Sequence, residues 1–512
     1  MVKNFFISTA ISYTNGPPHM GHAYEVIAAD VIARFNRLQN KNVFFLTGTD
    51  EHGLKVQQKA NKLEISSQEL ANQISKKFID MGNGLNCSNN DFIRTSEERH
   101  KKAVKEIWLR MKDNGDIYLD DYSGWYSIID EAFYQESELI KNDLGEPLSP
   151  NKTPVEWVEE KSYFFRLSAY EKKLLDLYES DNEFIQPISR MNEVRNFVKG
   201  GLKDISISRK GLEWGIDVPG DNEHSIYVWV DALTNYISAL QWPDDDGLYD
   251  VFWPGDLHLI GKDIIRFHAV YWPAFLLSAG LPIPKKIFAH GFILNKGEKM
   301  SKSLGNIEDP ISLMESFGVD QLRYFLMREI PFGSDGNYSD KLLINRVNAD
   351  LSNDLGNLSQ RCLSMVKKNC NQLVPSKGEL MDVDLELLNS IELKKNNIIK
   401  LMDKFQISSY LSEVFDAISD TNKYFSNQKP WELKSVDEGR MNTVLWVTCE
   451  MLRRFGILLQ PVIPSGSSML LGFLSINDNE RTIDFLNDDY ALIPGDPIQN
   501  PEVIFPKIEL KE

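Results

Sequence analysis

The fold of this chain is decided by one short stretch, Ser12-Tyr13-Thr14-Asn15-Gly16-Pro17-Pro18-His19-Met20-Gly21-His22. The apolar run 5–7 precedes it, and apolar side chains recur at helical spacing through residues 23–35, which follow it. We therefore expect a strand, a tight turn and a helix. The unpaired N–H groups at the start of such a helix favour an anion, and the two histidines add side-chain donors. A plain surface turn with two histidines explains the same stretch, so the rest of the chain must decide.

Composition limits the class of protein. The 512 residues are too many for one ordinary core, and 42% hydrophobic with 25% charged residues is typical of a soluble protein of several domains. No apolar run is long enough to cross a membrane, and the first residues enter a strand directly, which leaves no room for a targeting peptide. We expect a cytoplasmic protein without a membrane partner.

The net charge limits the kinds of partner that we expect, and the cysteine content limits the compartment and the metal content. A net charge of −18 disfavours indiscriminate nucleic-acid binding, so a nucleic-acid partner must meet local basic patches. The four cysteines form no C-x-x-C pair, which predicts a reducing compartment and no structural zinc.

Strands and helices alternate in the first 300 residues. Residues 43–53 are typical of a buried strand ending in a polar loop with Asp50, which completes a parallel βαβ unit whose ligand lies at the carboxyl ends of the strands. Helical periodicity follows in 60–75 and 97–114. Short aromatic strands in 115–213 break the alternation, which resumes at 225–231, 257–263 and 286–292. We predict an α/β fold, a Rossmann-like parallel sheet split by an inserted α/β module.

A lysine-rich loop and a helical region complete the chain. Residues 294–306 have no apolar face and carry several lysines and serines, so they are either a solvated loop or a loop that closes on a polyphosphate. Long amphipathic segments fill 345–368, 384–404, 407–427 and 438–459, which predicts an all-α bundle, and the tail after Pro494 is expected to wrap back in extended form.

Two signatures together identify a family. His19-Met20-Gly21-His22 resembles the HIGH signature of the class I aminoacyl-tRNA synthetases, and Lys299-Met300-Ser301-Lys302-Ser303 resembles their KMSKS signature. Further stretches spread over the whole chain are similar to the methionine-specific branch of that family: 13–16, 49–53, 227–232, 261–263, 267–268, 357–361 and 430–431.

The resemblance implies an ATP-dependent ligase. Methionine and ATP would form methionyl-adenylate and pyrophosphate, and the methionyl group would then move to the terminal adenosine of a methionine tRNA, the initiator included. Mg²⁺ is expected to arrive with the ATP. The implied domains are the first half of the Rossmann catalytic domain (1–114), an inserted connective module (115–213), the second half (214–292), the KMSKS loop with the stem-contact region (293–341), and the helical anticodon-binding domain with its tail (342–512).

The resemblance also implies site residues. The catalytic set is His19, His22, Lys299 and Lys302; the ATP site comprises His19, Gly21, His22, Asp263, Lys299, Ser301 and Lys302. The methionine pocket comprises Ile11, Tyr13, Asp50, Trp229, Leu233, Tyr236, Phe267 and His268, with Asp50 on the substrate ammonium; anticodon bases would meet Asn357, Arg361 and Trp431.

Several alternatives stay open at this point. The pocket aromatics are also typical of core, Asp50 could cap the helix beginning near Gly53, Asp263 could pair with Lys262 or Arg266, and a tryptophan beside a proline is usually packed. Many relatives bind zinc through cysteines of the inserted module, but residues 115–213 contain no cysteine, so we expect a zinc-free insert and no metal ligands. No appended tRNA-binding domain follows the bundle, so a monomer is expected.

Competing functions fit less well. A synthetase for leucine or valine has a much larger editing insert. A non-catalytic relative would be expected to have a broken signature, and a nucleotidyltransferase would have no use for the long helical bundle.

The lysine loop generates a test. Lys302→Ala is expected to lower methionine-dependent ATP–pyrophosphate exchange by orders of magnitude, because the loop would lose charge that neutralises the separating phosphates. Thermal unfolding should not change. Normal exchange in the folded variant would remove the loop from the mechanism.

Overall fold

The central sheet of the protein is entirely parallel. The computed structural model describes residues 2–129, 132–134, 136–142, 144–244, 247–295, 297–299 and 308–509. The strand order is β10-β16-β15-β1-β3-β2, and β4 also pairs with β3. The predicted α/β class is confirmed. The strands of this sheet are β1 (Asn4–Thr9), β2 (Ser12–Tyr13), β3 (Asn42–Asp50), β4 (Asp91–Arg94), β10 (Ile185–Gln186), β15 (Leu257–Gly261) and β16 (Ile287–His290).

Helices cover both faces of this sheet, because side chains alternate along each strand. Ile7 and Phe45 contribute to one hydrophobic core, and Phe6 and Phe44 to the other. The first core continues into the helical bundle. The helices of the catalytic half are α1 (Met20–Leu38), α2 (Leu54–Lys62), α3 (Ser67–Gly84), α4 (Glu98–Asp113), α5 (Glu171–Ser180), α6 (Ile188–Lys199), α7 (Val228–Leu233), α8 (Asn235–Ser238), α9 (Tyr249–Phe252) and α10 (Trp272–Ser278).

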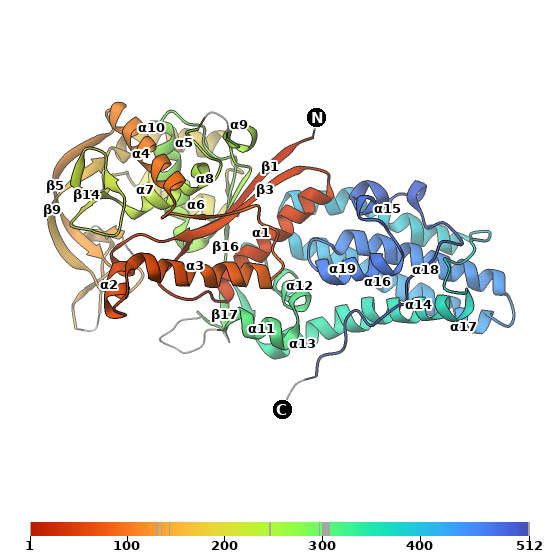
Figure 1. Cartoon of the computed structure of the whole chain (residues 1–512). Helices are drawn as coiled ribbons and strands as arrows, with labels where there is room; N and C mark the ends of the chain where they lie inside the picture. Colours follow the sequence, from red (N-terminus) through yellow and green to blue (C-terminus); the bar gives the residue numbers. More distant parts are fainter. Residues whose placement is uncertain are drawn as a thin grey trace.

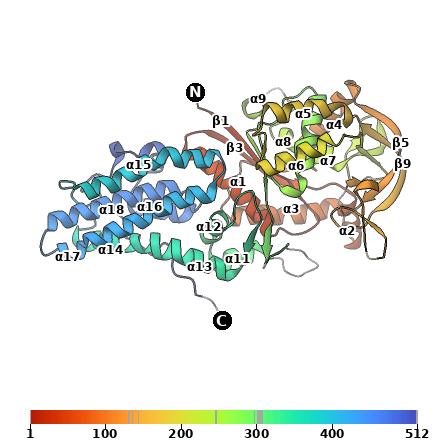
Figure 2. The ribbon, with the colours of Figure 1, turned by 180° about the vertical axis from the view of Figure 1, so that it is seen from behind.

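The inserted module contains antiparallel sheets. Its largest sheet has the strand order β11-β9-β5-β6. The two long strands, β5 and β9, lie at the end of the molecule opposite the bundle (Figures 1 and 2). The range 115–213 stays a prediction, although β10, which lies inside it, belongs to the central sheet. The remaining strands are β5 (Ile117–Ser127), β6 (Ala132–Tyr134), β7 (Ile140–Lys141), β8 (Pro147–Leu148), β9 (Glu156–Phe165), β11 (Ile205–Ser206), β12 (Ser208–Lys210), β13 (Asp217–Val218), β14 (Asp221–Ile226), β17 (Ile293–Asn295), β18 (Glu298–Lys299) and β19 (Gly336–Tyr338).

Two expected elements differ from the structure. The helical segment 60–75 is divided between α2 and α3, because Glu64 has a φ of 56° and the Ser66 side chain caps the new helix by accepting from Glu69 N–H. The segment 225–231 is not a strand of the central sheet. It contains the end of β14, which pairs with β12 and β13, and most of α7. A short apolar run does not distinguish strand from helix by its pattern.

The predicted bundle and tail are confirmed. Helices α14 to α19 form the half of the molecule away from the central sheet (Figure 1). Val374 exchanges backbone hydrogen bonds with Gly495 and Asp496, and Phe505 packs against Gly466. None of the helices in the described ranges is long and apolar enough to cross a membrane. The α-helices that follow the catalytic half in the sequence are α11 (Pro310–Phe317), α12 (Val319–Glu329), α13 (Asp340–Val347), α14 (Asn357–Asn369), α15 (Asp382–Asp403), α16 (Ile407–Gln428), α17 (Pro430–Leu433), α18 (Glu438–Leu459) and α19 (Pro464–Phe473).

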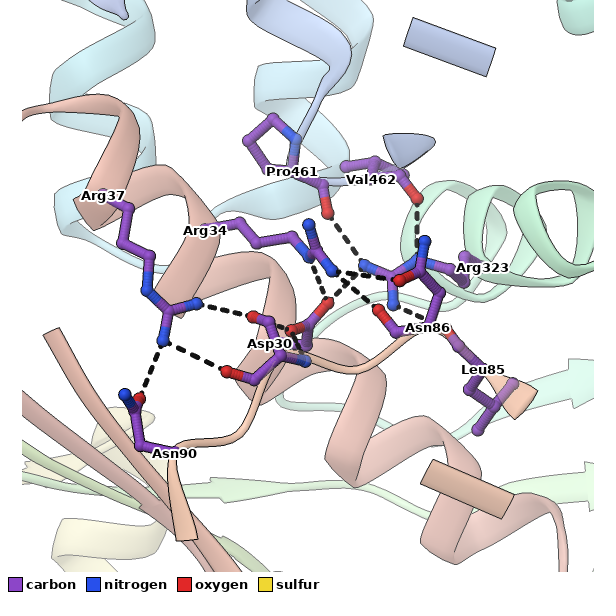
Figure 3. A network of polar contacts seen from close by, with 10 residues as sticks. Asp30, Arg34, Arg37, Leu85, Asn86, Asn90, Arg323, Pro461 and Val462 are labelled. Atoms are coloured by element: carbon purple, nitrogen blue, oxygen red, sulfur yellow. Dashed lines mark hydrogen bonds and ion pairs between the residues drawn. The ribbon is translucent and has the colours of Figure 1, made fainter. Parts of the chain in front are cut away.

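A buried ion pair joins the two halves (Figure 3). The Arg323 guanidinium, on α12, lies 2.7 Å from Asp30 Oδ2 on α1 and is fully buried. It also donates to the carbonyls of Leu85, after α3, and of Pro461 and Val462, after α18. Burial alone would raise the pKa of Asp30, but Arg323 and Arg34 hold it below its usual value. One side chain therefore fastens four segments that are distant in the sequence.

This ion pair generates a stability prediction. Arg323→Met is expected to lower the free energy of unfolding by about 3 to 5 kcal/mol, because Asp30 would keep a buried charge without its main partner. Urea unfolding followed by tryptophan fluorescence measures the change. Lys76→Met, which breaks an exposed pair with Asp80, should change it by less than about 1 kcal/mol. Equal effects of the two substitutions would contradict the role of the buried pair.

Candidate active site

A cavity of about 480 Å³ lies at the carboxyl edge of the central sheet. Ala10, Asp50, Gly261 and His290, at or just beyond the ends of β1, β3, β15 and β16, all line it. Its size is that of a small-molecule site. The cavity brings together most of the site residues expected in the catalytic half: Ile11, Tyr13, His19, Gly21, His22, Asp50, Trp229, Leu233, Tyr236, Asp263 and His268.

Two histidines cap the helix that begins at this cavity. His19 Nδ1 accepts from Gly21 N–H at 3.1 Å, and His22 Nδ1 accepts from His19 N–H at 3.1 Å. The centroids of the two imidazole rings lie 3.8 Å apart. Because both Nδ1 atoms accept hydrogen bonds, the proton of each neutral imidazole is on Nε2. The fit at Gly21 is tight, since a Cβ there would lie 3.0 Å from the His19 ring.

Aromatic side chains build the opposite wall. Trp229 on α7 stacks on Phe267 with ring centroids 3.7 Å apart. Phe267 itself does not appear among the lining residues and supports Trp229 from behind. The Tyr236 hydroxyl lies 2.7 Å from His268 Nε2, and His268 Nδ1 lies 2.9 Å from the Ile264 carbonyl, which can only accept. Burial lowers the pKa of His268 to about 4, so the ring is neutral and Nε2 accepts from Tyr236.

Asp50 and Asp263 are acidic residues of the cavity for which the sequence left other roles open. Asp50 is buried at the end of β3 and lines the cavity, and the helix that follows has Gly53 at its N-cap. Lys262 pairs with Asp335 at 2.7 Å and Arg266 lies 3.6 Å from Glu138, while Asp263 lines the cavity.

Glu25 and His290 form a buried pair in the same cavity that was not predicted from the sequence. His290 Nε2 lies 2.8 Å from Glu25 Oε2. Burial raises the pKa of Glu25 despite the histidine; burial alone would lower the pKa of His290, but the Glu25 carboxyl more than offsets this and raises it. Both positions had a local signal. Glu25 follows His22 at helical spacing, and His290 ends the last strand before the lysine loop.

The lysine loop begins beside the cavity, which Ile293 of β17 lines. Strand β17 pairs antiparallel with β18 and parallel with β19. The backbone of Lys299 ends β18. Ser301 and Lys302 lie outside the described residues. Within the described ranges no group of three or more His, Cys, Asp or Glu side chains could hold a metal ion.

The three expected anticodon residues lie in the bundle. Asn357 begins α14, and Arg361 lies one turn further along the same helix. The Arg361 guanidinium is 5.0 Å from the Phe425 ring and 5.5 Å from the Trp431 ring. Trp431 is 46% exposed, so it is not fully packed beside Pro430. Figure 1 places α17, which carries it, at the end of the bundle away from the central sheet.

Family models match nearly the whole chain. The model described as tRNA synthetases class I (M) matches residues 5–143 and 137–363. The model described as the anticodon binding domain of methionyl tRNA ligase matches residues 374–512.

Individual proteins are similar over the same length. The chain is 53% identical to the methionine–tRNA ligase of Brucella suis biovar 1, covering 99% of this chain and 98% of the relative. It is 49% identical to that of Rickettsia conorii, covering 99% and 100%. A solved structure of Mycobacterium tuberculosis methionyl-tRNA synthetase in complex with methionyl-adenylate matches with a TM-score of 0.96 and 50% identity, covering 99% and 100%. Its apo form matches with a TM-score of 0.90 and 46% identity, covering 100% of this chain and 99% of that one.

The histidine cap generates a prediction. Gly21→Ala is expected to displace the His19 ring by a few tenths of an ångström, because the new methyl group would lie about 3.0 Å from it, and to lower the free energy of unfolding by less than about 1 kcal/mol, because the strained cap outweighs the gain from alanine in a helix. Thermal unfolding measures the loss. Gly82→Ala on α3, where a Cβ would meet nothing within 4 Å, should instead stabilise the protein by about 0.5 to 1 kcal/mol. Stabilisation by both alanines would contradict the close contact.

Proposed function

The chain belongs to the class I methionine–tRNA ligase family, and from this premise we propose how its residues divide the work. The activity is activation of methionine by ATP, followed by charging of a tRNA. The observation that carries the residue assignments is the single cavity that gathers both signature histidines, an aromatic wall and Asp50.

Methionine is assigned to the aromatic end of the cavity. A thioether is apolar and accepts hydrogen bonds weakly, so a closely shaped pocket must recognise it. Trp229 and Leu233 supply apolar surface, and the hydrogen-bonded pair of Tyr236 and His268 closes the wall. Asp50 would pair with the substrate ammonium and orient the substrate carboxylate. Ile11 and Tyr13 line the same cavity and complete the proposed pocket, supported by Phe267.

ATP is assigned to the start of α1. His19 and His22 accept at Nδ1 from the backbone, so each carries its proton on Nε2, which we assign as the donor to phosphate oxygens, and the helix dipole adds positive potential. Asp263 is assigned to the ribose side of the nucleotide. Lys299, Ser301 and Lys302 are assigned to the triphosphate from the loop that follows β17. Mg²⁺ would arrive on the phosphates and neutralise part of their charge.

The reaction needs no covalent enzyme intermediate. A methionine carboxylate oxygen attacks the α-phosphorus of ATP, the bond to the β-phosphate oxygen breaks, and pyrophosphate leaves. The ribose hydroxyl of the terminal adenosine of the tRNA then attacks the methionyl carbonyl and releases AMP. Fixed imidazole donors favour the first step because they face the charge that develops on the phosphates.

The bundle is proposed to read the anticodon of a methionine tRNA, the initiator included. Single-stranded bases are recognised by stacking on aromatic rings and by hydrogen bonds to their edges. A half-exposed Trp431 with the Arg361 guanidinium beside it offers both, and Asn357 lies one helical turn from Arg361. The cytoplasmic location and the monomeric state expected from the sequence stay predictions.

ATP–pyrophosphate exchange tests the proposed substrate. The purified chain should exchange pyrophosphate with methionine and not, at equal concentration, with leucine, valine or isoleucine, because an aromatic pocket shaped for a thioether rejects branched side chains. Faster exchange with any of the three would overturn the assignment.

Trp431 provides a separate test of the bundle. Trp431→Ala is expected to leave exchange unchanged and to lower kcat/KM for tRNA charging by about 10- to 100-fold, because a stacking surface is lost. Trp157→Ala is the matched control, since Trp157 is 51% exposed but lies in the insert. Equal losses in exchange and charging, or an equal loss in the control, would count against an anticodon role.

A further inference from the structure

A buried carboxylate lies directly behind the proposed methionine pocket. Asp231 on α7 is 1% exposed. Its Oδ2 lies 2.7 Å from His52 Nδ1, and its Oδ1 lies 2.7 Å from His100 Nε2. Burial alone would raise the pKa of Asp231, but the charge of His52 and the hydrogen bonds from both rings lower it to about 2. The group is therefore ionised at neutral pH, and since a carboxylate only accepts, both imidazoles donate to it.

The two histidines come from different walls of the site. His52 follows Asp50 by two residues in the loop after β3, and Asp50 lines the cavity. His100 is on α4, and its other ring nitrogen lies 2.8 Å from the Ser238 hydroxyl on α8. Helix α7 presents Trp229 to the cavity. Asp231 thus connects the wall that carries Asp50 to the wall that carries Trp229.

The loop after β3 is held independently of this contact. The Glu51 carboxylate accepts from the Arg94 guanidinium at 2.6 Å and from the hydroxyl groups of Ser75 and Thr49. Gly53 N–H donates to the Trp214 carbonyl, and Trp214 Nε1–H donates back to the Glu51 carbonyl. The loop is therefore a fixed reference, and Asp50 keeps its place whether or not α7 does.

Helix α7 is short, most of its apolar side chains are buried in the core, and Trp229 stacks on Phe267. It spans Val228–Leu233, six residues, with no side-chain cap at its N-terminus. A helix this short is unstable without tertiary contacts. Asp231 adds a polar anchor from α7 to the loop after β3 and to α4.

We propose that Asp231 is a positioning residue that sets the separation between Asp50 and Trp229, and so the length of the methionine pocket. The proposal rests on the assignment of this cavity to methionine. It predicts that losing the carboxylate changes recognition of the amino acid and leaves recognition of ATP, which meets α1, in place. It also predicts looser rejection of side chains that are longer by one methylene group, because such discrimination depends on a wall that does not yield.

Steady-state exchange kinetics test this. Asp231→Asn should raise KM for methionine by at least about tenfold, because hydrogen bonds to a buried charge are lost, while KM for ATP stays within about twofold. The ratio of kcat/KM for methionine over ethionine, which has one more methylene group, should fall. Asp116→Asn is the matched control: Asp116 is also buried, accepts from Tyr170 and Ser278, and does not line the cavity, so both KM values should stay near wild type.

A second variant distinguishes the proposed positioning role from a folding defect. His52→Leu removes the donor on the Asp50 loop, together with the ring contact between His52 and Trp214, and should reproduce the rise in KM for methionine. In the His52→Leu, Asp231→Asn double variant the rise should be no greater than in the more affected single variant, because one link is cut twice. Parallel rises in both KM values, or an unchanged KM for methionine in variants with wild-type circular dichroism, would overturn the proposal. Absence of methionine-dependent exchange in the wild type would overturn the proposed function instead.

Discussion

The carboxyl ends of the parallel strands meet at one edge, and the rest of the site depends on this constraint. Parallel strands require long crossovers, so residues that lie far apart in the chain end at the same place. Ala10, Asp50, Gly261 and His290 reach the cavity in this way. Helix α1 starts at the same edge, and β17, where the lysine loop begins, follows β16, the last of these strands in the sequence. The sheet thus gathers a helix N-terminus, an acidic group, an aromatic wall and the strand β17 without any of them being neighbours in sequence.

Neutral histidine is the main polar side chain of this site. His19 and His22 accept backbone hydrogen bonds at Nδ1, and burial lowers the pKa of His268 to about 4. Burial also lowers the pKa of His258, which stacks on Tyr236. A neutral imidazole whose one nitrogen is held by the fold presents the other in a fixed direction. Such preorganised groups suit a reaction in which charge develops on phosphate oxygens and no covalent enzyme intermediate forms.

Buried charge holds the elements of this protein in relation to one another at two levels. Arg323 fastens α12 to Asp30 and to carbonyls that follow α3 and α18, so it relates the catalytic half to the bundle. Asp231 relates α7 to the loop after β3 and to α4. A buried charge is costly unless every partner is in place, which makes each of these groups a sensitive link between distant segments. The first link concerns the whole molecule, and the second concerns one wall of one pocket.

The sequence by itself determined the elements whose pattern is local and long. Periodicity and the stretch ending at His22 predicted β1, α1 and β3, and the amphipathic segments predicted the bundle. The structure showed that the local cap at Ser66 divides 60–75 into two helices, while only the tertiary structure decided that most of 225–231 is helical and that Glu25 meets His290. The physical reason is the same for the last two. The short run around Asp231 fits a strand or a helix equally well, and the core packing of α7 and the contacts of Asp231 with His52 and His100 come from elements distant in the sequence. Hydrogen bonds between buried groups of separate elements produce no periodic pattern in the sequence, so periodicity cannot predict them.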